Sequence, residues 1–289
     1  IIKEKIDEKS KNLTLEDKER IIELTKNLKT RQEKSDDPEI LPKVTKEDIP
    51  KIRTYAKSES YKDDNKNFFY KVGTNGITYH SMIFPCSPLT EDEFKVASLF
   101  TNTLTDVGIG NKSYEEVQKI QSAVTGGISA NFTLIPNENQ SSHSLGLKIT
   151  SKSLEEKEIA MQNLMIETAK DSNFSDKNRI KDMLNFISAD NEKSLIQNGH
   201  ILSMSNAGAQ INNISATNDF ASGLNFITNT SKLSKNINND SELDRYIELL
   251  NSIKNKINPI PSYSFTASSL EMHQSKINFE FDNKNNSFS

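Results

Sequence analysis

Two adjacent glycines divide the stretch from Ile120 to Leu134, IQSAVTGGISANFTL, into halves with different periodicity. Before them, apolar residues recur at helical spacing through Val117, Ile120 and Val124. After them, apolar and polar residues alternate, as in a strand with one buried face. The chain has only 10 glycines in 289 residues, and a glycine after the last helical turn adopts positive φ without a Cβ clash. The pair therefore predicts a helix that reverses at once into a strand, which restricts the chain to folds that join helices to a sheet.

Further strand-like segments lie on both sides of this point. The runs 67–72 and 77–84 flank the dipeptide Asn75-Gly76, which is typical of tight hairpins, so these two runs are predicted to pair. The strand at 128–134 is joined to another at 141–151 by the polar turn PNENQ. Strands joined by short turns indicate mainly antiparallel pairing.

Helices are predicted between and after these strands. Thr90 with Glu93 forms a capping box for one helix, and Gly108 is expected to end it. Ser113 with Glu116 forms a second capping box. Later segments predict three more helices and a final strand, at 154–170, 175–200, 241–257 and 262–267 respectively. The predicted fold class is α+β, with a mainly antiparallel sheet and helices packed on one of its faces.

The first 34 residues are predicted to form a helical hairpin arm that leads into a proline-bearing connector. Its first helix is marked by Ile2 and Ile6, and its second by a cap at Thr14 and a narrow apolar seam of Ile21, Leu24 and Leu28. Such a seam is too thin to fold alone. We therefore expect three segments: the arm and connector at 1–50, an αβ domain at 51–267, and a tail or the start of a following domain at 268–289.

Charge and composition exclude several classes of protein. The 36 basic and 40 acidic residues are interleaved, and the net charge is −4. No basic stripe is present, so we expect no nucleic-acid partner. No apolar run approaches the roughly 18 residues that span a bilayer, so we expect no membrane partner. Cys86 is the single cysteine; it predicts no internal disulfide and a reducing compartment, and no nearby pattern supplies a histidine to activate it.

The order of these segments resembles the pitrilysin/insulinase-type zinc metallopeptidases, in the presequence-protease and falcilysin branch. Residues 1–50, with an "LP…DIP" connector, look like that branch's hinge arm. The segment VGIGNKSYEEVQKIQSAVTGGISA resembles the Gly–Tyr-Glu-Glu–Thr-Gly-Gly-Ile segment of its third domain, and DKNRIKDML resembles its Asp-x-x-Arg helix. Gly199-His200 resembles its Gly-His turn. The resemblance implies the hinge arm and the third, associated and non-catalytic, metallopeptidase-like αβ domain.

The catalytic motif of that family is absent from this chain. Family members degrade short unfolded peptides in a closed chamber, with one zinc held by an inverted H-x-x-E-H on a helix of the first domain. The four histidines here are far apart in the sequence, at His80, His143, His200 and His273. We therefore expect no catalytic residue and no metal ligand in this chain, and no peptidase activity from it alone.

The resemblance also implies what surrounds this piece. The parent protein would hold the zinc, and the partners would be peptide substrates together with the N-terminal catalytic half and the C-terminal domain of the same polypeptide. The expected compartment is a bacterial cytoplasm, or an organelle matrix if the parent carries a targeting peptide. Whether the parent is active, which peptides it degrades and its oligomeric state are open.

The strand after the glycine pair has two interpretations. The family's catalytic domain pairs its substrate with an edge strand, and the counterpart of that strand here implies a substrate-facing wall formed by Gly127, Ile128, Ser129, Ala130 and Asn131. The residue pattern itself needs only a helix stop followed by a core strand, and it favours that interpretation. Gly126, Gly199 and His200 are expected to have structural roles, with His200 as a packing or capping histidine.

Three functions follow from the sequence. The first is the non-catalytic hinge and third domain of a zinc oligopeptidase, forming chamber wall and joint. The second is a stand-alone, catalytically inactive relative that binds peptides or pairs with an active subunit. The third is an unrelated, mainly helical scaffold, which would lack the predicted sheet.

Overall fold

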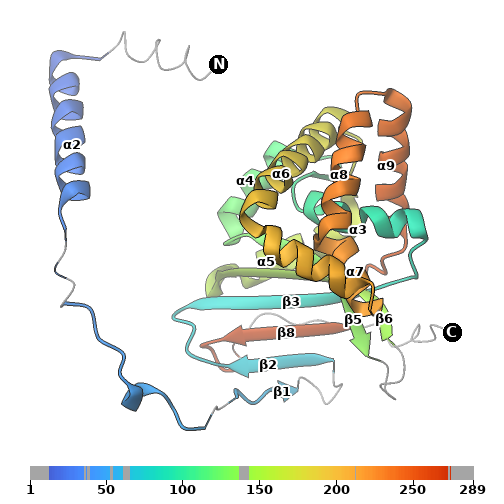
Figure 1. The fold of residues 1–289 in the computed structure, drawn as a ribbon. Helices are drawn as coiled ribbons and strands as arrows, with labels where there is room; N and C mark the ends of the chain where they lie inside the picture. Colours follow the sequence, from blue (N-terminus) through green and yellow to red (C-terminus); the bar gives the residue numbers. More distant parts are fainter. Residues whose placement is uncertain are drawn as a thin grey trace. The chain divides into compact units, whose positions relative to one another are not determined.

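The computed structural model describes residues 13–35, 37, 40–52, 55–60, 66–136, 143–211, 213–272 and 274. The chain divides into two compact units, Ile1–Thr54 and Tyr55–Ser289 (Figure 1). The first helix of the expected hairpin, with Ile2 and Ile6, and most of the expected segment 268–289 lie outside the described residues. The division into three segments therefore stays a prediction.

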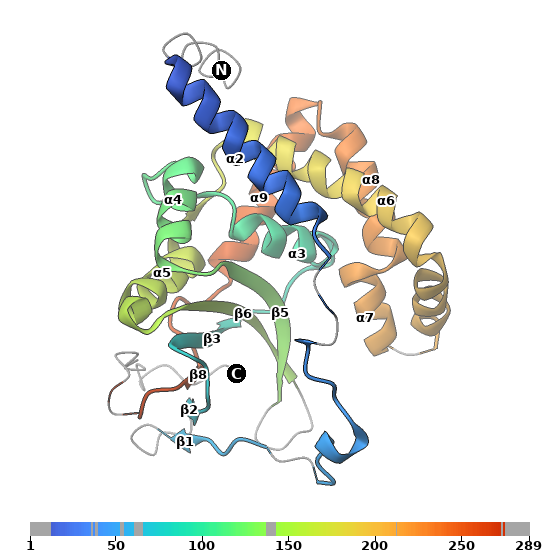
Figure 2. The same cartoon turned by 90° about the vertical axis from the view of Figure 1, so that its left-hand side faces the viewer.

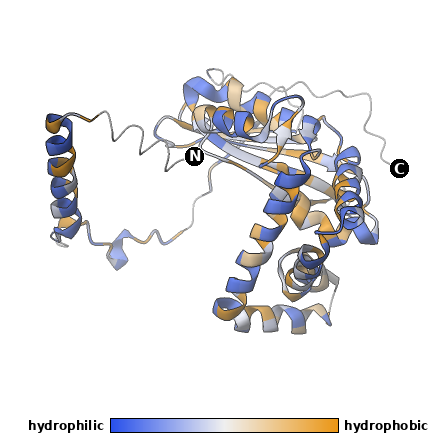
Figure 3. Ribbon diagram, turned by 90° about the horizontal axis from the view of Figure 1, so that it is seen from above, coloured by the Kyte–Doolittle hydropathy of each residue, from blue (hydrophilic) through white to orange (hydrophobic). Residues whose placement is uncertain are grey.

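The first unit contains the helix α2, Leu15–Glu33, and the short 3-10 turn η2, Lys46–Asp48. The predicted cap is present, because the Asp17 N–H donates to Thr14 Oγ1 at 3.1 Å. No described side chain of this unit is buried, and Figure 3 shows hydrophobic positions along the surface of α2. The seam residue Leu24 is 58% exposed. The described part of the unit therefore has no core of its own.

The second unit is built on a six-stranded sheet in the order β1-β2-β8-β3-β6-β5. Its strands are β1 Glu59–Ser60, β2 Asn67–Lys71, β3 Ile77–Cys86, β5 Ile128–Pro136, β6 His143–Leu154 and β8 Tyr263–Ser268. Every neighbouring pair is antiparallel except β2 and β8. The predicted pairing of the strands on either side of PNENQ is confirmed by β5 and β6.

The predicted hairpin around Asn75-Gly76 is wrong. Both residues have the positive φ of a tight turn, 54° and 80°, but β2 and β3 do not pair with each other. Instead β8 lies between them, parallel to β2 and antiparallel to β3. Residues 72–76 therefore span two strand spacings, about 10 Å. The turn signal is local, whereas β8 comes from the far end of the chain.

Helices of the second unit cover one face of the sheet (Figure 1). They are α3 Glu91–Leu104, α4 Tyr114–Val124, α5 Glu158–Asp171, α6 Lys177–Ala209, α7 Asn213–Ser222, α8 Leu224–Asn236 and α9 Asp240–Asn255, with the 3-10 turn η3 Glu155–Lys157 before α5. The capping boxes at Thr90 and Ser113 are present as predicted. With its mostly antiparallel sheet and its helices on one face, the unit confirms the predicted α+β class.

Gly108 does not end a helix, contrary to expectation. The helix α3 stops at Leu104, and Gly108 belongs to β4, Gly108–Ile109, which pairs with β7, Ser172–Asn173. A Cβ at Gly108 would lie 2.5 Å from the backbone oxygen of Lys112. The glycine is thus required by a close approach of two backbone segments rather than by positive φ.

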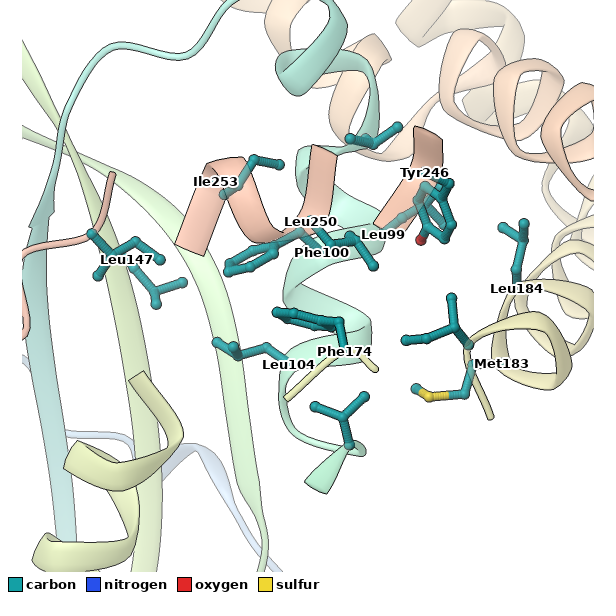
Figure 4. Close-up of a cluster of buried hydrophobic side chains, with 14 of the residues drawn as sticks. Leu99, Phe100, Leu104, Leu147, Phe174, Met183, Leu184, Tyr246, Leu250 and Ile253 are labelled. Carbon is teal, nitrogen blue, oxygen red and sulfur yellow. The ribbon is translucent and has the colours of Figure 1, made fainter. Parts of the chain in front are cut away.

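The core lies between the sheet and the helices. Alternate residues of β3 and β6 point into it, including the fully buried Phe84 and Leu147. They meet Phe100 of α3, whose ring packs on that of Phe132 with centroids 6.1 Å apart. Figure 4 shows this cluster continuing to α6 and α9, through residues such as Leu184 and Leu250. The core fixes the helix-covered face of β5 and leaves its outer edge outside the packing.

Candidate functional site

The two glycines before β5 have separate roles. The helix α4 ends at the extended residue Thr125, with φ −133°, so a glycine in positive φ is not its stop signal as expected. Gly126 donates its N–H to the backbone oxygen of Lys152 at 2.7 Å. Gly127 has φ 110° and donates to Thr125 Oγ1 at 3.0 Å. The first glycine therefore joins the chain to β6, and the second supplies the backbone conformation that turns it into β5.

Gly126 also accommodates the side chain of Lys152. A Cβ at Gly126 would lie 2.9 Å from Lys152 Cε and 3.0 Å from its Cγ. Real Cβ atoms do not approach other atoms so closely, so the lysine stem lies directly against the glycine backbone. Sequence reasoning did not find this contact, because Lys152 is distant in the sequence and on another strand. The only sign of it in the sequence was that two glycines stand together, because ending a helix requires only one.

The strand β5 forms one edge of the described sheet (Figure 2). It pairs with β6 in the register Ile128↔Ser151 to Pro136↔His143. Ile128, Ala130 and Phe132 pack against the core, while Ser129 and Asn131 are exposed on the opposite face. In an antiparallel ladder every second residue directs its N–H and C=O away from its partner strand. Among the described residues no strand receives these groups, so residues 128–131 present an edge to which another strand can add. Gly127 precedes this edge, and its N–H and C=O bond Thr125 Oγ1 and Ser151 Oγ.

The histidines do not gather into a metal site. His80 lies on β3 and is 1% exposed; its Nδ1 is 2.9 Å from Thr266 Oγ1, and its Nε2 has no partner. Burial lowers the pKa of His80 to about 3. His143 lies at the start of β6, His200 lies on α6, and His273 is outside the described residues.

Nothing in the described part of the chain fits a zinc ion. No group of three or more His, Cys, Asp or Glu side chains with metal-binding geometry occurs among the described residues. The neutral imidazole of His80 is enclosed beside a hydroxyl rather than a second ligand.

Cys86 is a poor nucleophile. Burial raises the pKa of its thiol to about 11, with Lys256 opposing and Glu93 reinforcing the rise. The nearby carboxylate and ammonium are committed to each other, with Glu93 Oε2 2.5 Å from Lys256 Nζ. Burial disfavours ionisation of Glu93, but hydrogen bonds from Lys256, Ser252 and Thr90 outweigh it and lower its pKa to about 2. This pair of a buried carboxylate and a partly buried ammonium ties α3 to the end of α9.

Two of the sequence motifs meet in space. Arg179, three residues after the α6 cap at Asp176, places its guanidinium 4.4 Å from the ring centroid of Tyr114 at the start of α4. Its Nε also donates to the backbone oxygen of Asp106 at 3.0 Å, and Gln118 donates to Asp106 Oδ1 at 2.8 Å. The Tyr-Glu-Glu and Asp-x-x-Arg segments thus join two helix starts to one loop, which is a structural role.

The predicted Gly-His turn is wrong. Gly199 and His200 lie inside α6, Lys177–Ala209, and both are exposed. His200 neither packs in the core nor caps a helix end. The prediction of a turn was wrong because one glycine inside a helix costs only about 1 kcal/mol, and the continuous helix α6 tolerates it.

Comparison with known proteins decides the family. The sequence model that describes the associated domain of the peptidase M16 family, subfamily C, matches residues 1–233. The chain belongs to this family. The match confirms the predicted associated, non-catalytic domain, and the relatives described next confirm the presequence-protease branch.

Relatives of this peptidase-associated domain include much longer proteins. The mitochondrial presequence protease of Yarrowia lipolytica is 27% identical over 229 residues, which cover 77% of this chain and 23% of that protein. Protein HypA of Clostridium perfringens is 27% identical over 293 residues, covering 99% of this chain and 29% of that protein. The chain spans about a quarter of the length of these relatives. A crystal structure of a peptidase M16 inactive domain from Pseudomonas fluorescens has a TM-score of 0.45 and 13% identity, covering 76% of this chain and 48% of that one.

The relatives come from more than one compartment. A presequence protease of Arabidopsis thaliana, 26% identical over 80% of this chain and 22% of that protein, carries both chloroplastic and mitochondrial in its name. Within the described ranges, every helix is too short or too polar to cross a lipid bilayer.

Proposed function

We propose that residues 1–289 form the hinge arm and third domain of a zinc-dependent oligopeptidase that degrades unfolded peptides in a closed chamber. In this proposal the zinc and the catalytic residues lie in an N-terminal half of the same polypeptide, and a C-terminal domain follows. The arm and connector comprise 1–50, the chamber-wall domain 51–267, and the following segment 268–289. The family match over residues 1–233 carries the proposal. The compartment is then a bacterial cytoplasm or an organelle matrix.

The properties of the first unit support the role of the arm. Its described residues bury no side chain, yet they include ten large hydrophobic residues that are 47% or more exposed, among them Ile22 at 67% and Val44 at 84%. Most of the stability of a helix in a protein comes from packing its apolar face, and no side chain of α2 is buried. A capped helix with an apolar seam and no core is suited to packing against other parts of a longer polypeptide, as a joint between two halves requires.

The free edge of β5 supports the role of the chamber wall. Peptide addition to a sheet edge uses backbone groups and so accepts many sequences, which is what an oligopeptidase for unfolded peptides requires. Ile128, Ser129, Ala130 and Asn131 would supply these groups. Gly127 would set the start of the wall, because its N–H and C=O already bond Thr125 Oγ1 and Ser151 Oγ. The core packing of Ile128 and Ala130 holds the edge rigid.

A pair of proline substitutions tests the wall. Adjacent residues of β5 direct their N–H groups to opposite edges, so one of Ser129→Pro and Ala130→Pro removes an outward donor while the other breaks the ladder with β6. The probe is an N-dansylated, C-amidated octapeptide of Ser, Thr and Val, and binding to the 289-residue chain is followed by fluorescence polarisation. We expect the variant that keeps its thermal stability to lose at least about fivefold in affinity. Unchanged affinity in that variant would refute the wall.

The alternative function, a stand-alone inactive relative, is distinguished from this proposal by the rest of the gene's coding sequence. An H-x-x-E-H segment upstream in the same polypeptide selects the hinge and third domain. A complete polypeptide without that segment selects the inactive peptide-binding subunit instead.

A further inference from the structure

The ammonium group of Lys152 has no counter-charge. Lys152 lies on β6 directly opposite Tyr79 of β3 and is exposed. It makes no ion pair, whereas the nearby Lys157 donates to the backbone oxygen of Ala123 at 2.6 Å and so covers the end of α4. Those statements hold for the described residues. The aliphatic stem of Lys152 lies against Gly126, just before the free edge. Its ammonium has no ion pair among the described residues and is therefore available for a ligand.

The position of that ammonium follows from the glycine pair. Lys152 Cγ and Cε lie against Gly126, so the stem runs from β6 across the chain that leads into β5. An extended lysine reaches about 6 Å from Cα to Nζ, and strands are about 4.8 Å apart. The ammonium can therefore reach over the start of β5, toward a strand added on its outer side.

We propose that Lys152 binds the C-terminal carboxylate of a peptide added to the free edge of β5. In an antiparallel pair, the end of the added strand lies beside the start of β5, which is where Lys152 lies. A free carboxylate at this point meets an ammonium without another partner, and a charge-assisted hydrogen bond of this kind is about twice as strong as a neutral one. The site thus favours released peptides, which have a free C-terminus, over internal segments of longer chains.

This inference rests on the proposed role of β5 as the chamber wall, and it adds which end of the peptide is recognised.

Lys148 provides a matched control. It lies on β6, on the same face and four residues before Lys152, opposite Asn131 in the middle of the edge, and it has no ion pair among the described residues either. No glycine directs its stem toward the start of β5.

The test compares two N-dansylated octapeptides of Ser, Thr and Val, one with a free C-terminal carboxylate and one with a C-terminal amide. Binding to the full 289-residue chain is measured by fluorescence polarisation at low and moderate salt. We expect the carboxylate peptide to bind about tenfold more tightly than the amide at low salt, with a smaller difference as salt rises. Lys152→Met should abolish this preference without changing the affinity for the amide, while Lys148→Met should keep it.

A second variant protects the test from a folding artefact. Gly126→Ala forces the Lys152 stem away from the backbone, so it should reduce the carboxylate preference while leaving the lysine in place. Equal affinities for the two peptides in the wild-type chain, or a preference that survives Lys152→Met in a protein of unchanged thermal stability, would overturn the assignment. In either case binding of the amide peptide would leave the β5 wall standing, whereas failure of both peptides to bind would remove the wall and the anchor together. Preferential binding of a single-stranded oligouridylate in a Lys152-dependent manner would also overturn it.

Discussion

Gly127 and Gly199 have opposite backbone requirements, because only Gly127 has positive φ. Gly127 has φ 110°, while Gly199 lies within the regular helix α6, and a Cβ at either position would meet no atom within 4 Å. Gly127→Ala should therefore cost about 1–2 kcal/mol of unfolding free energy through backbone strain alone. Gly199→Ala should instead stabilise the chain by about 0.5–1 kcal/mol through helix propensity. Chemical denaturation of both variants measures the two changes in unfolding free energy. If Gly199→Ala were destabilised, a turn rather than a helix at Gly199 would be indicated.

His80 makes the stability of the fold depend on pH. Burial lowers its pKa from 6.5 to about 3, so the unfolded chain binds a proton that the native chain excludes. This contribution is fully present above pH 6.5 and is lost as the pH falls toward 3, with a slope of up to about 1.4 kcal/mol per pH unit. Urea denaturation between about pH 7 and 4 measures the slope.

A matched pair of variants isolates the histidine. His80→Gln should flatten the pH dependence between about pH 6.5 and 4.5, whatever it does to the stability at neutral pH. His200→Gln, on the exposed surface of α6, should leave the dependence as it is. The same slope in wild type and His80→Gln would show that the buried imidazole is not its source.

At the scale of elements, α3 is tied to the end of α9 by a buried ion pair. Glu93 is 3% exposed and accepts hydrogen bonds from Lys256 and from Ser252 Oγ, the latter at 2.6 Å. Lys256→Met leaves the carboxylate buried without its cation and should cost about 2–3 kcal/mol, because a buried charge without its partner is poorly solvated. Because the pKa of Glu93 is lowered from 4.5 to about 2, its contribution is present above pH 4.5 and is lost as the pH falls toward 2.

The control is an ion pair on the surface that also involves α3 and α9. Arg245 Nη2 lies 3.1 Å from Asp92 Oδ2, with both side chains more than half exposed. Arg245→Ala should change the unfolding free energy by less than about 1 kcal/mol. Equal effects of the two substitutions would mean that the Glu93 carboxylate is solvated rather than buried.

Among the helices and strands, features set by nearby residues were predicted from the sequence, whereas the pairing of distant strands was not. Capping boxes at Thr14, Thr90 and Ser113 were predictable because both partners lie within one helical turn of each other. The hairpin at Asn75-Gly76 was mispredicted because the strand that separates β2 from β3 comes from the far end of the chain.

In the candidate site, too, features within one segment could be predicted, whereas contacts between distant segments could not. The edge segment Gly127–Asn131 was predictable as a strand from its alternation, but its place at the edge depends on the whole strand order. The contact between Lys152 and Gly126 could not be predicted, since a lysine in the sequence does not indicate where its stem lies. The Arg179–Tyr114 contact was visible only as two separate motifs.

At the scale of the whole molecule, the arm should be far less stable than the αβ unit. The helix α2 buries no side chain, whereas β6 is hydrogen-bonded on both sides, to β3 and to β5. In the full chain, amides of α2 should exchange with solvent on the order of 100-fold or more faster than those of β6, because the arm opens locally and β6 opens only with the core. Equal protection of α2 and β6 would show that the arm is packed without a second half and would argue against a joint.

We propose that this chain is a structural part of a zinc peptidase and that its own residues do not hold the metal. The most direct measurement is the zinc content of the purified chain after dialysis against zinc, combined with hydrolysis of an unstructured fluorogenic peptide with and without a chelator. We expect substoichiometric zinc and no chelator-sensitive hydrolysis, because the described residues contain no group of metal ligands. One tightly bound zinc per chain, together with hydrolysis that the chelator abolishes, would contradict it.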